Sequence, residues 1–129
     1  MLSGVTVSVP GMLSLEMVTI DCADPARLTT FWTAALSTKV QLDHGEFVLL
    51  AAPGEGRVAV GLQKVPEPKS GKTRIHLDLQ ADDLEAEVAR LVELGATELD
   101  RQRVPGLRWT VLADPEGNEF CVGQAEPRG

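Results

Sequence analysis

The chain has 129 residues, a formal net charge of −7 and two cysteines, which favours a single domain and excludes several kinds of partner. Nucleic-acid binding needs clustered Lys and Arg, and this net charge has the wrong sign. No apolar run reaches membrane-spanning length. The hydrophobic content of 43% and charged content of 24% are ordinary for a soluble globular chain.

Neither the N-terminus nor the cysteines indicate secretion. Residues 1–14, MLSGVTVSVPGMLS, lack a basic n-region and a long apolar core, so we expect an extension rather than a signal peptide. Met12 is an alternative start, because the letters MLS occur at Met1 and again at Met12. Cys22 and Cys121 lie far apart in apparent strands, and two reduced thiols in a cytoplasmic protein explain them better than a disulfide.

The first half of the domain reads as a strand, a helix and three strands. Met17–Cys22 alternates, with Val18, Ile20 and Cys22 on one face and Met17, Thr19 and Asp21 on the other. Asp24-Pro25 is typical of a helix start. The buried stripe of that helix is expected to comprise Leu28, Phe31, Trp32, Ala35 and Leu36. Further strands are predicted at residues 39–42, 47–51 and 57–65, and residues 66–72 form the most linker-like segment.

The second half repeats this order. Residues 75–80 alternate, with Ile75, Leu77 and Leu79 on one face and His76, Asp78 and Gln80 on the other. A helix is predicted to begin at Asp82-Asp83 and to end at Gly95. Its apolar positions are Leu84, Val88, Leu91, Val92 and Leu94. Strands follow at residues 97–100, 108–113 and 119–122, and the tail 125–129 is expected to fray.

The two halves therefore form an internal repeat. Met17 precedes Asp24 by as many residues as His76 precedes Asp83. VLLAAPGEGRVAVGLQ also resembles TVLADPEGNEFCVGQ, which aligns Pro53 with Pro115, Gly56 with Gly117, Val60 with Cys121 and Gln63 with Gln124. We predict an α+β fold of two tandem βαβββ modules, 15–65 and 73–124, whose curved mixed sheets surround a shared cavity.

This pattern resembles the glyoxalase/bleomycin-resistance/dioxygenase superfamily, also called the vicinal oxygen chelate superfamily, in its glyoxalase-like actinobacterial branch. The resemblance rests on HLDLQADDLEAEVARLVELGA, DCADPARLTTFW, LADPEGNEFCV and the internal repeat, and it covers residues 15–124. It implies a small cytoplasmic homodimer that binds a small molecule. It leaves open whether the chain is an enzyme or a ligand-sequestering resistance protein.

The resemblance also implies positions for a divalent cation, on the first and last strands of each module. These positions are Met17, Val60 or its neighbour Gly61, His76 and Cys121. Only His76 matches the usual ligand set, although Glu119 lies two residues before Cys121. A thioether and two positions without a ligand group do not suit a cation that seeks nitrogen and oxygen. We therefore expect no metal or other cofactor, with His76 the ligand if one is bound.

His76 is the leading candidate for chemistry, because an unperturbed histidine titrates near neutrality. We expect it to act as acid or base, with Asp78 or Asp21 as its partner carboxylate. Both carboxylates sit within strands, where aspartate is disfavoured without a reason. The competing interpretation is structural, with a hydrogen-bonded histidine and carboxylates paired with Arg74, Arg108 or Lys64.

Other side chains are predicted to contact the ligand. They are Gln63, Trp109, Phe47, Met17, Cys121 and Glu119, with Trp109 and Phe47 as stacking surfaces. Cys121 is a nucleophile only if a neighbour lowers its pKa, and buried cysteine more often packs as a small apolar group. Two functions follow: a metal-independent enzyme, of the superfamily's lyase or isomerase type, acting by acid–base chemistry on a small carbonyl or oxygenated metabolite; or a protein that sequesters an antibiotic or aromatic ligand.

Overall fold

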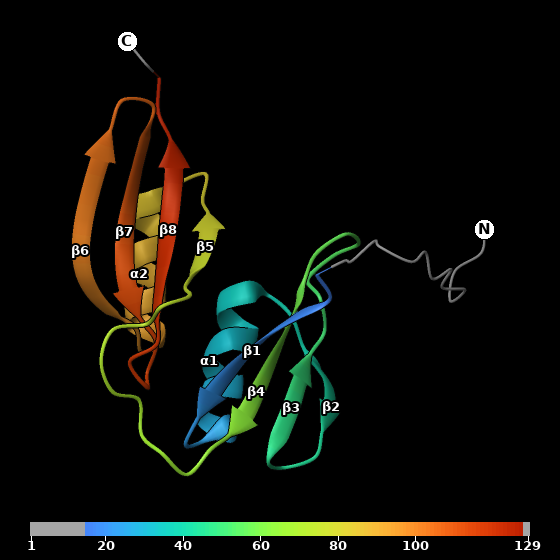
Figure 1. The fold of residues 1–129 in the computed structure, drawn as a ribbon. Helices are drawn as coiled ribbons and strands as arrows, with labels where there is room; N and C mark the ends of the chain where they lie inside the picture. Colours follow the sequence, from blue (N-terminus) through green and yellow to red (C-terminus); the bar gives the residue numbers. More distant parts are fainter. Residues whose placement is uncertain (1–14, 128–129) are drawn as a thin grey trace, which may run out of the picture.

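A computed structural model describes residues 15–127 and shows two four-stranded sheets, each with one helix. The first module contains β1 (Met17–Cys22), α1 (Pro25–Leu36), β2 (Val40–Asp43), β3 (Phe47–Leu50) and β4 (Ala59–Lys64). The second contains β5 (Leu77–Gln80), α2 (Leu84–Leu94), β6 (Thr97–Val104), β7 (Leu107–Ala113) and β8 (Glu119–Ala125). The predicted α+β fold of two βαβββ modules is confirmed (Figure 1).

The two sheets share one topology. Their strand orders are β1-β4-β3-β2 and β5-β8-β7-β6, and the first strand of each module pairs in parallel with the last. The other neighbours are antiparallel. β1 and β5 therefore each lie at the end of a sheet with one free edge. Among residues 15–127, no helix is long and apolar enough to cross a membrane.

Both helices begin where the sequence predicted. The Asp24 carboxylate accepts a hydrogen bond from the Arg27 N–H at 3.2 Å, and Asp83 accepts one from the Ala86 N–H at 3.1 Å. Pro25 occupies the first helical turn, where its missing N–H costs nothing. α2 ends at Gly95, whose φ of +123° is one that other residues rarely adopt.

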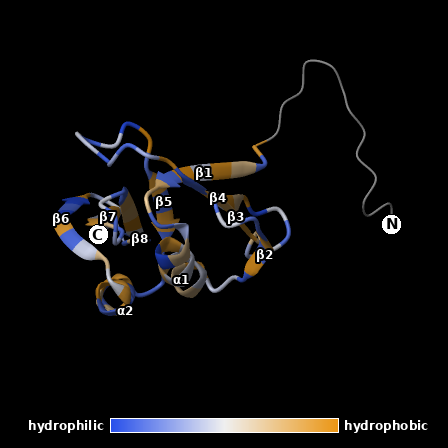
Figure 2. Cartoon of the chain, turned by 90° about the horizontal axis from the view of Figure 1, so that it is seen from below, coloured by the Kyte–Doolittle hydropathy of each residue, from blue (hydrophilic) through white to orange (hydrophobic). Residues whose placement is uncertain are grey.

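One apolar core joins the two modules. α1 buries Leu28, Phe31 and Trp32, and the rings of Phe31 and Trp32 pack edge-on against each other and against Phe120 of β8. α2 buries Leu84, Val88 and Leu91. Val92 and Leu94, the other two apolar positions of this helix, are 44% and 38% exposed, because the helix covers its sheet with one narrow face. Apolar and polar colours accordingly interleave along the helices and strands (Figure 2).

Residues of the second module hold α1 at both ends and in the middle. The Glu116 carboxylate accepts hydrogen bonds from the N–H groups of Ala23 and Asp24 at 2.7 and 2.8 Å. The Arg90 guanidinium donates to the carbonyls of residues 34 and 35, each at 3.1 Å. The Trp32 indole donates to buried Asp114 at 3.1 Å. An anion at the helix N-terminus and a cation at its C-terminus both oppose the helix dipole. α1 lies in the middle of the molecule in both views (Figures 1 and 2).

Several strand boundaries differ from the sequence prediction, and three strands of the second module differ by two residues or more. β5 begins at Leu77 rather than at residue 75, because its partner β8 begins at Glu119, and Ile75 is 81% exposed. β6 extends to Val104, and its hairpin with β7 turns at Gly106, where φ is +88°. β8 continues to Ala125, one residue into the tail that was expected to fray, and the Glu126 N–H donates to the Gly106 carbonyl at 3.0 Å.

Candidate functional site

A cleft of about 780 Å³ lies on the face of the second sheet that points away from α2. Side chains alternate along a strand, so one set packs under the helix and the other faces outward. On β8, Phe120 and Val122 are buried in the core, while Cys121 and Gly123 line the cleft. The lining residues are Lys72, His76, Asp78, Leu79, Gln80, Leu107, Trp109, Val111, Glu119, Cys121, Gly123 and Ala125.

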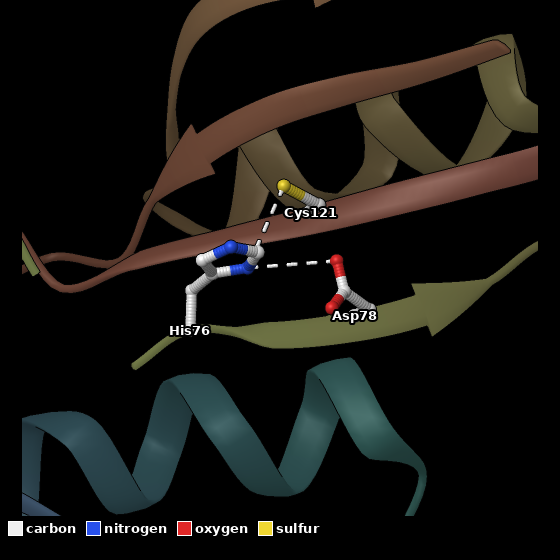
Figure 3. Close-up of side chains that lie close together, drawn as sticks. All are labelled: His76, Asp78 and Cys121. Atoms are coloured by element: carbon white, nitrogen blue, oxygen red, sulfur yellow. Dashed lines mark hydrogen bonds and ion pairs between the residues drawn. The ribbon is translucent and has the colours of Figure 1, made fainter. Parts of the chain in front are cut away.

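Three of these side chains converge, as the sequence predicted for His76 and Asp78. The Nδ1 atom of His76 lies 3.5 Å from Asp78 Oδ1 and 3.9 Å from Cys121 Sγ (Figure 3). His76 lies two residues before Asp78, at the start of the edge strand β5. Cys121 is the register partner of Asp78 on β8. The histidine and aspartate side chains are 46% and 73% exposed, whereas Cys121 is buried.

The electrostatic surroundings keep the Cys121 thiol protonated. Burial raises the pKa of Cys121, and the Asp78 carboxylate raises it further. A nucleophilic cysteine needs a cationic neighbour that lowers its pKa; Lys72 acts in this direction, but burial and Asp78 outweigh it, so these surroundings favour a neutral thiol. Cys22, on the helix-facing side of β1, has its pKa raised to about 11, chiefly by burial. Both cysteines are free.

The same cleft contains an ion pair, of which the sequence predicted only one partner, Glu119. Lys72 Nζ lies 2.8 Å from Glu119 Oε1, and this hydrogen bond lowers the pKa of Glu119 and raises that of Lys72. Glu119 was a predicted ligand contact, but Lys72 was read as part of a charged linker. A second hydrogen bond joins the end of the linker to β8: the Thr73 hydroxyl accepts from the Glu119 N–H at 3.4 Å. Sequence alone offered no signal that the linker runs back to β8.

The candidate residues of the first module lie elsewhere. Asp21, Gln63, Phe47 and Met17 are not among the residues that line this cleft. Asp21 is exposed on β1, and the Gln63 amide donates to the backbone carbonyls of Glu46 and Lys64. The structure therefore does not bring Asp21 to His76, because Asp21 lies on β1 of the first sheet, whereas His76 directly precedes β5 of the second.

Strand register corrects one alignment within the repeat. Asp78 pairs with Cys121 on β8. The equivalent of Asp78 in the first module is Thr19, which pairs with Gly61 on β4, so Gly61 rather than Val60 is equivalent to Cys121. Val60 is 6% exposed and belongs to the core. A Cβ atom at Gly61 would lie 2.9 Å from the Phe47 ring and 3.1 Å from Met17 Sδ. In the first module, therefore, an aromatic ring and a thioether fill the position of a metal ligand.

The match between Gln63 and Gln124 is wrong by the same one-residue shift, because the register makes Gly123 the equivalent of Gln63. Gln124 faces α2 rather than the cleft. Its side-chain oxygen accepts from the Leu84 N–H at 2.7 Å, at the start of that helix, and from the Arg108 guanidinium at 3.1 Å. Gln124 thus stabilises the second module and does not bind a ligand in the cleft.

The residues present do not fit the four-ligand cation site that the resemblance implies. His76, Asp78 and Cys121 place one donor atom each within 4.8 Å of one another. The equivalent positions of the first module carry Met17 and Gly61 on the other sheet, which offer no nitrogen or oxygen donor from a side chain. The group in the second module therefore offers one nitrogen, one oxygen and one sulfur donor, fewer than the four side chains of that site.

Comparison with known proteins identifies the fold. The chain is similar to a glyoxalase/bleomycin resistance protein/dioxygenase family enzyme from Burkholderia phytofirmans PsJN, with 19% identity, a TM-score of 0.75, and coverage of 88% of this chain and 100% of that chain. A superfamily member from Sphaerobacter thermophilus DSM 20745 has 24% identity, a TM-score of 0.67, and coverage of 88% and 98%. TioX from Micromonospora sp. ML1 has 18% identity, a TM-score of 0.63, and coverage of 88% and 99%.

A search of curated proteins finds no match to the sequence. A sequence model described as a glyoxalase-like domain does match, over residues 17–123. That match spans both modules, from the first residue of β1 to Gly123 within β8. The chain therefore belongs to the glyoxalase-like domain family.

Proposed function

We propose that this glyoxalase-like protein is a metal-independent enzyme that performs acid–base chemistry on a small carbonyl or oxygenated metabolite. The observation that carries the proposal is the pairing of His76 with Asp78 at the cleft. A carboxylate beside Nδ1 favours the tautomer with its proton on that nitrogen. The Nε2 atom of His76 is then the free base.

The cleft supplies what such a reaction requires. Nε2 would take a proton from a carbon next to a carbonyl, or from a hydroxyl group, and return it to the product. Asp78 would hold the ring and stabilise the imidazolium that forms. Cys121 stays a neutral group beside the pair, so the reaction assigns it no covalent step.

A second function, sequestration of an antibiotic or aromatic ligand, is supported by the apolar half of the same cleft. Leu107, Trp109 and Val111 of β7 form a wall beside Gly123 of β8. Such a wall binds a flat ligand without any reaction. TioX and the structures named for bleomycin resistance are similar in fold, which is compatible with either function.

A His76→Ala variant distinguishes the two functions. Turnover is first sought in a panel of small carbonyl and hydroxy compounds, and binding is measured in parallel by calorimetry. The enzyme proposal expects turnover to fall at least 100-fold with affinity nearly unchanged. Loss of affinity without any turnover in the original protein would support sequestration instead. His44→Ala, in an exposed turn, is the matched control.

The metal-independent part of the proposal has its own test. Activity should persist after dialysis against a chelator, and added Mn²⁺, Ni²⁺ or Zn²⁺ should not raise it. Elemental analysis of the purified protein gives the metal content at the same time. Activity that is lost with a stoichiometric metal and regained on its return would refute metal independence.

We also propose that the protein is a cytoplasmic homodimer. β1 and β5 each present a free edge, and a second cleft of about 1070 Å³ opens between the two modules, lined by Val18 and Val60 of one and Leu77 and Leu79 of the other. Free edges and apolar side chains are features that a second copy covers. Two free thiols suit a reducing compartment. Light scattering with size-exclusion chromatography gives the mass, and a monomer at micromolar concentration would refute the dimer.

A further inference from the structure

We propose that the cleft selects flat aromatic ligands that carry a positively charged amine, an inference that rests on the proposed binding function of this cleft. Three lining residues other than the histidine are charged: Lys72, Asp78 and Glu119. Lys72 and Glu119 lie 2.8 Å apart and largely neutralise each other. The neighbours of Asp78 in the cleft are the His76 ring, at 3.5 Å, and the Cys121 thiol, and neither lysine nor arginine pairs with its carboxylate among the described residues.

In the state in which His76 is the neutral base of the proposed function, the cleft therefore carries one surplus negative charge. The rise in the pKa of Cys121 shows the same field, because after burial its largest cause is the charge of Asp78. Arg108, the arginine of β7, lies on the opposite face, where it pairs with Glu85 and Glu126. The net charge of −7 over the whole protein adds a long-range attraction for cations.

The aromatic part of the proposal comes from Trp109. Among the described residues, the ring contacts join Phe31, Trp32 and Phe120, and none involves Trp109. Its neighbour across the sheet is Gly123, where an added Cβ would lie 3.7 Å from the Trp109 Cβ. The glycine keeps the wall beside the indole free of side-chain atoms. A flat ring has space to lie there, and a tryptophan face also attracts a cation directly.

Three matched probes test the charge preference: 2-naphthylmethylamine, which is a cation at pH 7, the neutral 2-naphthalenemethanol, and anionic 2-naphthoate. The chain has two tryptophans, so its ¹H–¹⁵N spectrum contains two indole signals. Trp109 reports the cleft, and Trp32, which is buried and bonded to Asp114, is the internal reference for an intact fold. Titration of the Trp109 signal gives each dissociation constant.

The amine should bind roughly two- to five-fold more tightly than the alcohol, and naphthoate more weakly than both, as for exposed charge pairs. Asp78→Asn should abolish the advantage of the amine and leave the affinity of the alcohol unchanged. Lys72→Met frees the Glu119 carboxylate and should increase that advantage. Asp82→Asn and Lys64→Met change the net charge equally but lie outside this cleft, so neither should alter it.

Equal affinities for amine and alcohol, or tighter binding of naphthoate, would overturn the charge preference while leaving the binding function intact. A Trp109 signal that moves with none of the three probes would overturn both the preference and the use of this cleft for flat ligands. An advantage for the amine that persists in Asp78→Asn would show that Asp78 is not its source and would overturn the assignment.

Discussion

Replacement of Asp114 by alanine should destabilise the whole domain, because one buried carboxylate joins the two modules. Asp114 is 3% exposed and accepts hydrogen bonds from the Trp32 indole at 3.1 Å, from two backbone N–H groups at 2.9 Å, and from the Asn118 amide. The indole lies in a side chain that is 1% exposed, so without Asp114 its N–H has no access to water.

The magnitude follows from these bonds. An unpaired buried donor costs about 1–3 kcal/mol, and each turn bond to the lost carboxylate contributes about 0.5–1 kcal/mol where water partly replaces it. We expect a loss of about 3–5 kcal/mol, against a total stability on the order of 5–15 kcal/mol for a domain. Urea unfolding at neutral pH measures the difference.

Two further variants make the test specific. Asp43→Ala removes an exposed carboxylate that accepts from the Gly45 N–H at 2.7 Å, and it should cost below about 1 kcal/mol. Trp32→Phe removes the buried donor itself, so its effect combined with Asp114→Ala should be smaller than the sum of the single effects. A loss in Asp114→Ala no larger than that in Asp43→Ala, or full additivity, would refute the reasoning.

Three other outcomes follow from the contacts already described. Arg90→Met should lower the free energy of unfolding by about 1–2 kcal/mol in urea, because it removes two hydrogen bonds and a cation from the end of α1; an unchanged midpoint would contradict this. Asp78→Asn should speed the reaction of Cys121 with a disulfide reagent at pH 8, since loss of the carboxylate lowers the pKa of the thiol and increases the thiolate; a slower reaction would contradict it. Glu119 should titrate below its ordinary range by carboxyl ¹³C NMR, and Lys72→Met should return it there. Because the folded-state pKa of Glu119 is lowered, its ion pair stabilises the fold above the ordinary pKa, and this contribution disappears as the pH falls through the lowered one.

The sequence predicted the modules well because their helix starts and turns depend on local chemistry. Asp24-Pro25 and Asp83 cap helices through bonds to residues three positions away, which are visible in the sequence. The extent of β6 was missed because all its side chains are exposed, so there is no alternation between apolar and polar residues to read. Its pairing with β7 comes from the backbone and from the turn at Gly106.

The site was predicted in part for a similar reason. His76, Asp78 and Cys121 were recognisable because they lie at the first and last strands of the second module, which the repeat identifies. The pairing of β5 with β8 brings the three residues together. Lys72 was missed because its position depends on the path of a linker, which no periodic pattern encodes. Ile75 was placed in a strand by alternation, but a strand ends where its partner ends, and that partner lies about forty residues later in the chain.

The bonds that hold α1 also determine when the first module can be completed during synthesis. Glu116 and Arg90, which satisfy the two ends of this helix, follow it in the chain by 92 and 55 residues. Until the ribosome has made the turn between β7 and β8, the indole of Trp32 has no partner and the ring of Phe120 is missing from the core. The two modules look like separate units in the structure, but their long-range contacts mean that the first module completes its folding only after the second has been synthesised.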